Sequence, residues 1–222
     1  MRAEPYVTPD TLPVRTAAWL EQVRGAVAPR PWLRLDPSRC ALLVVDMNRY
    51  FAHPDGASYL PASAAVLPRI LSLLGAWREL GAPVAFTRHG HRGPGDAGML
   101  GRFYRGWIRA DQPEAELLPE LSPREGEAVF PKTTYDAFLG TGLESWLQAR
   151  GVDQVLITGV LTQMCCETSA RAAFTRGFEV YLPADGTATT HEATHLCSLT
   201  GLAGAVAVVM STEEVLATCA RS

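Results

Sequence analysis

The sequence has no long apolar run and no block of like charge, and each absence excludes a class of protein. The longest apolar stretch, residues 201–210, is too short to cross a lipid bilayer. Lys and Arg number 20 against 23 Asp and Glu, which gives a formal net charge of -3. Without a basic block, nucleic acid is not an expected partner. We therefore predict that the protein binds neither a membrane nor nucleic acid.

The sequence also lacks a regular cysteine pattern. Its five cysteines include no C-x-x-C pair and no His spacing typical of structural zinc. The opening residues, MRAEP, contain no apolar signal core. Unpaired thiols without a secretion signal are typical of a reducing compartment, so we predict a cytoplasmic protein.

Apolar strands alternate with helical patterns along most of the 222 residues. Strands are predicted at residues 41–45, 83–87, 127–130, 155–158, 178–182 and 205–209, and helices at 62–80, 143–149, 168–174, 191–202 and 212–218. This alternation predicts a three-layer α/β fold, in which helices cover both faces of a six-stranded parallel sheet.

Two regions lie outside this alternation. Residues 1–36 are predicted to form an N-terminal arm before a domain at residues 37–222. Trp19, in a predicted helix of the arm, needs burial on the body of the domain or on a second subunit. Residues 89–123, rich in Gly, Arg and aromatic residues, are predicted to be a long irregular lid or binding loop.

Cys165 is the candidate nucleophile. It follows the predicted strand at 155–158 and precedes a predicted helix. A thiol at a helix N-terminus lies near backbone N–H groups, which favour the thiolate and can hold an oxyanion. The neighbouring Cys166 points about 100° away around the helix. We interpret Cys166 as a core residue, with a spare thiol as the alternative.

Two charged residues also follow predicted strands. Asp46 ends the first strand and Lys132 follows the third. The C-terminal ends of parallel strands meet at one edge of a sheet, so both can approach Cys165. The carboxylate can act as general base and the ammonium can keep it ionised, so that the thiol attacks a carbonyl and forms a thioester. A histidine approaching Cys165 in space remains an alternative.

Three motifs resemble the isochorismatase-like cysteine hydrolases, which include nicotinamidases, N-carbamoylsarcosine amidases and ureidoacrylate amidases. They are ALLVVDMN at residues 41–48, PKTTYDAF at 131–138, and GVLTQMC at 159–165 followed by Ala170-Arg171. The resemblance extends from about residue 41 to residue 216.

The resemblance implies a strand order of 3-2-1-4-5-6 and a catalytic triad of Asp46, Lys132 and Cys165. It also implies a cis peptide bond between Val160 and Leu161, with the backbone amides of Leu161 and Cys165 forming the oxyanion hole. A homodimer or larger homo-oligomer is a further implication.

Two departures narrow the expected reaction. Isochorismatases proper have no Cys at the position of Cys165, so the retained thiol favours amide or ureide hydrolysis. Nicotinamidases carry an Asp-x-His metal pair and a further His, where this chain has His89-Gly90-His91. Because the carboxylate and the extra ligand are missing, we expect neither a metal nor another cofactor.

Substrate contacts are predicted from residues near the strand ends and in the 89–123 region. They are Phe51, His91, Arg102, Trp107 and Tyr135. An arginine here could pair with a substrate carboxylate, and Trp107 could close the site or contact another subunit.

The leading hypothesis is a cysteine amidohydrolase that acts on a small amide or ureide. One alternative is an isochorismate-type vinyl-ether hydrolase that works through Asp46. The other is a non-catalytic protein that binds a small molecule on the same scaffold, with an intact triad but a blocked pocket.

Overall fold

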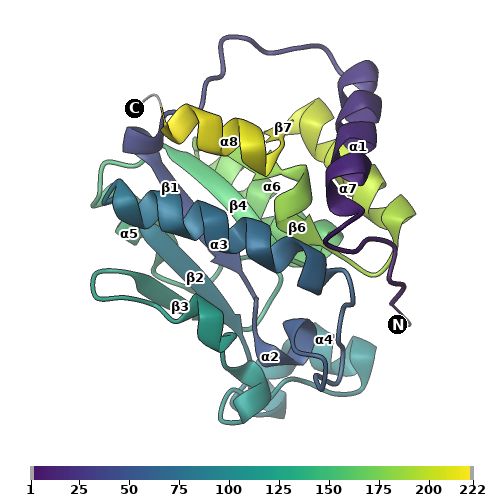
Figure 1. The fold of residues 1–222 in the computed structure, drawn as a ribbon. Coiled ribbons are helices and arrows are strands. Elements are labelled where there is room, and N and C mark those ends of the chain that lie inside the picture. The colour runs from purple at the N-terminus through teal and green to yellow at the C-terminus, as the bar shows by residue number, and fades with distance from the viewer. Residues whose placement is uncertain (1–2, 221–222) are drawn as a thin grey trace.

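A parallel β-sheet forms the centre of the computed structural model, which describes residues 3–220 (Figure 1). Its strands are β1 (Cys40–Val45), β2 (Val84–His89), β3 (Ala128–Lys132), β4 (Gln154–Val160), β5 (Glu179–Pro183), β6 (Thr187–Ala188) and β7 (Ala207–Met210). The order is β3-β2-β1-β4-β5-β7, and β6 pairs with β4 beside this path. The predicted parallel α/β sheet is confirmed, and its predicted sixth strand is β7. The two-residue β6 is additional, because so short a segment has no periodicity that the sequence could reveal.

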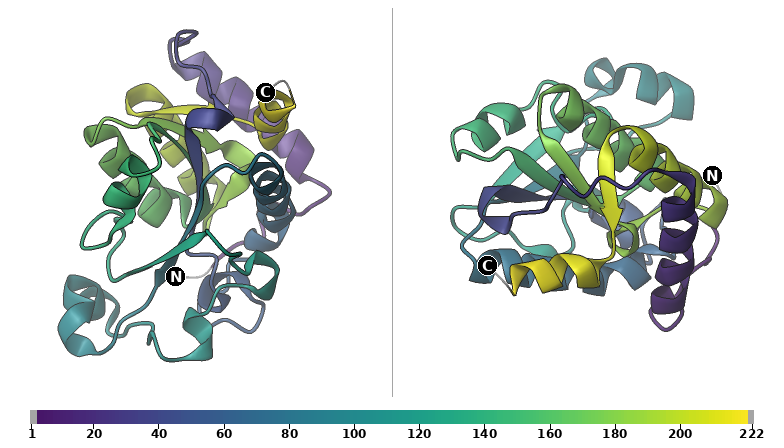
Figure 2. Two further views of the ribbon diagram at one scale, coloured as in Figure 1. Left: turned by 90° about the vertical axis from the view of Figure 1, so that its left-hand side faces the viewer. Right: turned by 90° about the horizontal axis from the view of Figure 1, so that it is seen from above.

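Helices cover both faces of the sheet. They are α1 (Leu12–Ala26), α2 (Arg49–Ala52), α3 (Ser63–Glu79), α4 (Pro94–Tyr104), α5 (Leu143–Gln148), α6 (Glu167–Thr175), α7 (Glu192–Ala205) and α8 (Thr212–Cys219). In Figure 1, α3 and α8 lie in front of the sheet and α6 and α7 behind it. Seen from above in Figure 2, α3 and α8 run side by side on one face.

The centre of the sheet is apolar because β1 and β4 have helices on both sides. Every residue of both strands is buried. They pair in register from Cys40 opposite Gln154 to Val45 opposite Gly159. Continuous apolar strands of this kind are typical of parallel sheets. The same register brings the C-terminal ends of β1 and β4 to one edge.

The 89–123 region is more ordered than the sequence predicts. It contains α4 and two short 3₁₀ turns, Pro113–Ala115 and Pro119–Leu121. The expectation of an irregular segment is therefore wrong for α4. The glycines of α4 lower its helix propensity, and Gly98, with φ of 49°, interrupts it with a kink. The hydrophobic periodicity of the sequence does not reveal a helix that is interrupted in this way.

The N-terminal arm packs on the body of its own chain. Its helix α1 contacts α7, and Trp19 is 3% exposed. Leu35 is also buried, whereas Trp32 is 72% exposed. Trp19 and Leu35 are therefore buried on the body of their own chain, the first of the two locations that the sequence left open. No helix within residues 3–220 is long and apolar enough to cross a membrane.

Candidate active site

The ends of three strands bring Asp46, Lys132 and Cys165 together. Asp46 directly follows β1, Lys132 ends β3, and Cys165 lies in the π-helical turn Thr162–Cys166 after β4. Lys132 Nζ is 2.6 Å from Asp46 Oδ2 and donates a hydrogen bond to Cys165 Sγ at 3.3 Å. It also donates to the backbone oxygen of Thr134 at 2.7 Å. The ammonium thus lies between the carboxylate and the sulfur.

The ion pair is completely removed from solvent, since both side chains are 0% exposed. Burial by itself would raise the pKa of Asp46, but the charge of Lys132 and hydrogen bonds from Lys132 and Thr87 lower it below its usual value. Burial likewise opposes the charged form of Lys132, and Asp46 outweighs it to raise the lysine pKa. The resting pair is therefore carboxylate and ammonium.

Cys165 is a neutral thiol in the resting site. Burial raises its pKa to about 12; Lys132 acts in the opposite direction, and Asp46 adds to the increase. The ammonium favours the thiolate, as predicted, but desolvation has the larger effect and opposes it. Loss of the thiol proton has to accompany attack on a substrate, with Asp46 as the nearby acceptor.

Backbone geometry at the ends of β1 and β4 permits this close arrangement. Asp46 has a φ of 49° and Gly159 a φ of 108°. A Cβ atom at position 159 would lie 2.0 Å from the backbone oxygen of Val45, so only glycine fits against β1. The peptide bond between Val160 and Leu161 is cis, which confirms this implication of the resemblance. The oxyanion role of the Leu161 and Cys165 amides stays a prediction.

The sequence interpretation missed two side chains that support the triad. Thr87 Oγ1 donates to Asp46 Oδ1 at 2.6 Å, and Asn48 Nδ2 donates to the backbone oxygen of His89 at 3.3 Å. Thr87 pairs with Val45 in the β1–β2 register, so the position next to Asp46 could have been found from strand pairing. Asn48 is fully buried within the motif at residues 41–48.

His89 lies beside the lysine. Its Nδ1 is 3.4 Å from Lys132 Nζ, and burial lowers its pKa to about 4. The hydrogen bond of Cys165 within residues 3–220 comes from Lys132 and not from a histidine. The arrangement of the described residues thus favours the carboxylate–ammonium–thiol set over a Cys–His pair.

A cavity of about 460 Å³ opens beside the sulfur of Cys165. Phe51, His91, Trp107 and Tyr135, all predicted to contact substrate, line it. Arg102 does not line it; its side chain is exposed on α4, with Nη1 3.7 Å from Met99 Sδ. The sequence placed Arg102 near the site because it treated the 89–123 region as one loop. The kinked helix α4 instead turns Leu100 and Tyr104 toward the cavity.

Leu161 and Cys165, both predicted site residues, also line the cavity, whereas the rest of its wall was not predicted. That rest comprises Ala3, Tyr50, Ser58, Tyr59, Leu60, His89, Leu100, Tyr104, Gly106, Ile108, Met164 and Thr190. The hydroxyl of Tyr104 on α4 is 2.9 Å from that of Tyr135 after β3. Segments remote in sequence therefore form the wall, and no local pattern could identify them together.

The two histidines of the His-Gly-His segment are held by other groups. Their rings contact edge to face, with centroids 4.9 Å apart. His91 Nε2 is 2.9 Å from the Thr133 backbone oxygen, and Nδ1 is 3.3 Å from that of Ile108. Residues 3–220 contain no group of three or more His, Cys, Asp or Glu side chains suited to a metal ion. That the protein needs no cofactor stays a prediction.

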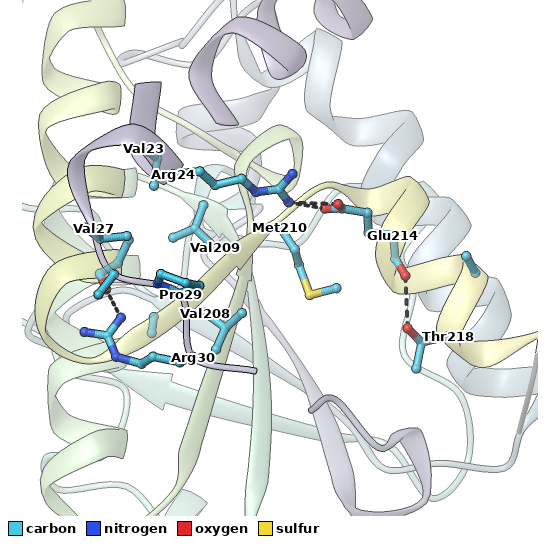
Figure 3. Close-up of a pocket in the computed structure, with 14 residues that line it drawn as sticks. Val23, Arg24, Val27, Pro29, Arg30, Val208, Val209, Met210, Glu214 and Thr218 are labelled. Carbon is cyan, nitrogen blue, oxygen red and sulfur yellow. Dashed lines mark hydrogen bonds and ion pairs between the residues drawn. The ribbon is translucent and has the colours of Figure 1, made fainter. Parts of the chain in front are cut away.

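A second hollow, of about 650 Å³, lies between α1, β7 and α8 (Figure 3). Arg24 and Glu214 form an ion pair across it at 2.8 Å. Arg30 donates a hydrogen bond to the backbone oxygen of Ala203, in the last turns of α7, at 2.6 Å. The other lining residues are mostly apolar, and none is Cys or His. The hollow is larger than the cavity at Cys165, yet its described residues include no nucleophile.

Comparisons with known proteins agree with this geometry. The model of the isochorismatase domain family matches residues 40–214. Nicotinamidase 3 of Arabidopsis thaliana is 36% identical over 180 residues, 78% of this chain and 85% of that protein. The phenazine biosynthesis protein PhzD1 of Pseudomonas aeruginosa is 32% identical over 219 residues, 96% of each chain. A cysteine hydrolase structure from Pseudomonas syringae has a TM-score of 0.82 and 30% identity, covering 87% of this chain and 99% of that one.

Proposed function

The chain belongs to the isochorismatase-like cysteine hydrolase family, and we propose that it is an amidohydrolase that cleaves the C–N bond of a small amide or ureide through a thioester on Cys165. One observation carries the proposal: a carboxylate, an ammonium and a thiol, remote in sequence, meet at the wall of a cavity. Such a set can supply a nucleophile and a general base at the same point.

The first half of the proposed reaction forms the thioester. A substrate carbonyl enters the cavity, Cys165 Sγ attacks its carbon, and Asp46 accepts the thiol proton. Asp46 is suited to this role because it is buried, is held ionised by Lys132 at 2.6 Å from Oδ2, and interacts with the thiol of Cys165. Asp46 then returns the proton to the leaving nitrogen, and the C–N bond breaks. Lys132 keeps the carboxylate ionised before each transfer.

The second half releases the acid. Asp46, again ionised, takes a proton from water, and the resulting hydroxide attacks the thioester carbon. The C–S bond then breaks, Asp46 gives its proton to the sulfur of Cys165, and the acid leaves. We propose that the amides of Leu161 and Cys165 hold the carbonyl oxygen during both attacks. Backbone donors of this kind are worth roughly 100-fold to 1,000-fold in rate.

Vinyl-ether hydrolysis is the second candidate, because an isochorismatase of Bacillus subtilis is 30% identical to this chain over 217 residues. That reaction would use Asp46 and would not need a sulfur. The thiol of Cys165 lies in the cavity wall with Lys132 donating to it, which favours the amidohydrolase. The non-catalytic alternative required a blocked pocket, and the open cavity at the sulfur counts against it.

The decisive experiment compares Cys165→Ala with Cys166→Ala. Both thiols are buried and adjacent, so Cys166→Ala controls for the loss of a sulfur from the same turn. Ammonia release from an amide panel should fall by at least about 10⁴-fold in Cys165→Ala and by only a few-fold in Cys166→Ala. Intact-mass detection should show an acyl adduct that maps to Cys165. A Cys165→Ala variant that keeps most of its turnover would refute the thioester mechanism.

We also propose that the protein assembles as a homodimer or larger homo-oligomer. Large apolar side chains on and near α4 support this, since Phe103 is 76% exposed and Met99 is 66% exposed. Light scattering of the purified chain tests the assembly directly, and a single mass near 24.0 kDa would contradict it.

A further inference from the structure

We infer that the substrate is an uncharged amide whose acyl group is apolar and larger than a single six-membered ring, and that carboxylate-bearing amides are excluded. This inference rests on the proposed function and adds the chemical class of substrate to it. It comes from the charges and the dimensions of the cavity wall.

The cavity offers a substrate carboxylate no cationic partner. Among its lining residues, all within the described chain, there is no Lys, Arg, Asp or Glu. Lys132 lies behind Cys165, and its charge is already paired with Asp46 at 2.6 Å. His89 is neutral near pH 7 because burial lowers its pKa to about 4. Both ring nitrogens of His91 face backbone oxygens.

Nearby arginines are directed elsewhere. Arg88 Nη1 pairs with Glu116 at 2.7 Å, and Arg92 lies beside Asp96. Arg102 lies on the exposed side of α4, next to the sulfur of Met99. None of the three belongs to the described lining, and neither do Arg105 and Arg109, the other arginines of the 89–123 region. The expectation that an arginine from this region would bind a substrate carboxylate is therefore not supported.

The missing cation has an energetic consequence. A carboxylate moved from water into a protein cavity loses much of its hydration, and without a paired cation the loss is not fully offset. An anionic substrate would therefore bind far more weakly than an uncharged one of the same shape. The same argument disfavours isochorismate, which carries two carboxylates.

The shape of the wall favours a bulky aromatic or apolar group. Six aromatic side chains line the cavity: Tyr50, Phe51, Tyr59, Tyr104, Trp107 and Tyr135. Its volume of about 460 Å³ exceeds the roughly 150 Å³ that holds one benzene molecule in a protein interior. A carboxamide at Cys165 therefore leaves space for a second ring, which the aromatic wall can cover.

Binding tests this inference without depending on turnover. The Cys165→Ser variant keeps the cavity but loses the nucleophile, so its dissociation constants report recognition alone. We expect naphthalene-2-carboxamide to bind roughly tenfold more tightly than benzamide. Benzamide should in turn bind at least about 100-fold more tightly than 4-carbamoylbenzoate, which adds a carboxylate to the same ring. Equal or tighter binding of 4-carbamoylbenzoate would overturn the inference.

Turnover of the unmodified chain separates the two proposals. Ammonia release that follows the same order supports both. Faster release from 4-carbamoylbenzoate than from benzamide overturns the substrate class and leaves the amidohydrolase intact. Selective binding of the uncharged amides without ammonia release or an acyl adduct supports the cavity argument and refutes the amidohydrolase.

A charge placed in the wall gives a matched test. Leu100 on α4 lines the cavity, and Leu100→Arg would supply the missing cation. We expect this variant to raise kcat/KM for 4-carbamoylbenzoate relative to benzamide by about tenfold or more. Leu100→Gln controls for a polar side chain of similar reach and should leave the ratio unchanged. If Leu100→Arg and Leu100→Gln gave the same kcat/KM ratio for 4-carbamoylbenzoate relative to benzamide, the missing cation would not be what excludes the anion.

Discussion

An ion pair borders each of the two hollows in this molecule, and the two pairs differ in their exposure to solvent. Asp46 and Lys132, beside the catalytic cavity, are both 0% exposed. Arg24 and Glu214, which cross the larger hollow at β7, have side chains 52% and 43% exposed. The desolvated charges therefore lie beside the smaller cavity, behind Cys165 in its wall. Volume alone would have identified the wrong site, whereas charge held in an apolar interior indicates the chemistry.

The difference follows from solvation. An exposed pair is screened by water, and each partner remains hydrated if the other is removed. A buried pair has lost that hydration, so each charge depends on the other. The four predictions below test this contrast.

The largest effect is expected for Lys132→Met. It leaves the carboxylate of Asp46 buried and unpaired, which should lower the free energy of unfolding by about 3–5 kcal/mol. Amide turnover should fall about 10³-fold or more, because Asp46 would then favour its protonated form. Urea denaturation and ammonia release measure the two effects.

A double variant separates these effects. Asp46→Asn combined with Lys132→Met removes both charges and should recover part of the lost stability without restoring turnover. Lys132→Met variants as stable as the wild type would show that the charges are not desolvated in solution.

Acid should weaken the buried pair next most strongly. The folded pKa of Asp46 is lowered, so its contribution to stability is present above its unfolded pKa of about 4 and is lost as the pH falls through the folded value. The raised pKa of Lys132 acts in the other direction, so its contribution is complete below its usual pKa and is lost only as the pH rises through the folded value. From about pH 5 to pH 9 both contributions are therefore constant.

This prediction is checked against the double variant that lacks both charges. As the pH falls below 4, the wild type should lose free energy of unfolding faster than the double variant, and between pH 6 and pH 8 the difference should stay constant. Parallel curves down to pH 3 would contradict it.

A smaller effect on turnover is expected from the contacts that hold the turn carrying Cys165. His195 Nε2 lies 3.0 Å from the Ala184 backbone oxygen and Nδ1 2.9 Å from Thr162 Oγ1, at the start of the nucleophile turn. Because a carbonyl only accepts, Nε2 donates to Ala184, and the Thr162 hydroxyl that contacts Nδ1 also donates to Thr187 Oγ1 at 3.2 Å. Trp19 of α1 covers the same ring edge to face, at 4.7 Å between centroids.

Thr162→Val removes this hydrogen bond without emptying the space. We expect kcat to fall about tenfold with KM unchanged, since the turn would hold Cys165 less accurately. Thr16→Val is the control, because the hydroxyl of Thr16 bonds only within α1, to Leu12 at 2.7 Å. A rise in KM with constant kcat in Thr162→Val would indicate a substrate contact in place of positioning.

The smallest effect should come from the exposed pair. Arg24→Met should change the free energy of unfolding by no more than about 1 kcal/mol and leave kcat/KM unchanged. Its stability should also depend less on salt than that of the wild type, since screening already weakens the pair. If Arg24→Met lowered the free energy of unfolding as much as Lys132→Met, the proposed difference between the exposed and the buried ion pair would be contradicted.

The sequence could predict the parts of the site that lie at the ends of strands. Asp46 and Lys132 adjoin apolar strands whose parallel direction follows from the alternating pattern and whose order was implied by the family resemblance, so their approach to Cys165 could be inferred. Thr87 could also have been found, since it pairs with Val45. Because the strands are parallel, the residues that directly follow them lie close together at one edge of the sheet.

The remaining features depend on contacts between distant segments. The pKa of Cys165 depends on how completely the surrounding chain removes water, and no local pattern reports this. Arg102 and Leu100 are two residues apart on α4, yet only Leu100 lines the cavity. Residues two apart on a helix point about 200° apart around its axis, and a region interpreted as loop gives no basis for assigning such faces.

Gly159 has a consequence for redesign of this enzyme. Since any side chain there would strike the backbone of β1 at Val45, a library that varies position 159 should yield few folded members. The aromatic rim supplied by α2, α4 and the segment after β3 has no such constraint. New ligands should therefore be reachable by exchanging rim residues alone, while Asp46, Lys132 and Cys165 stay unaltered.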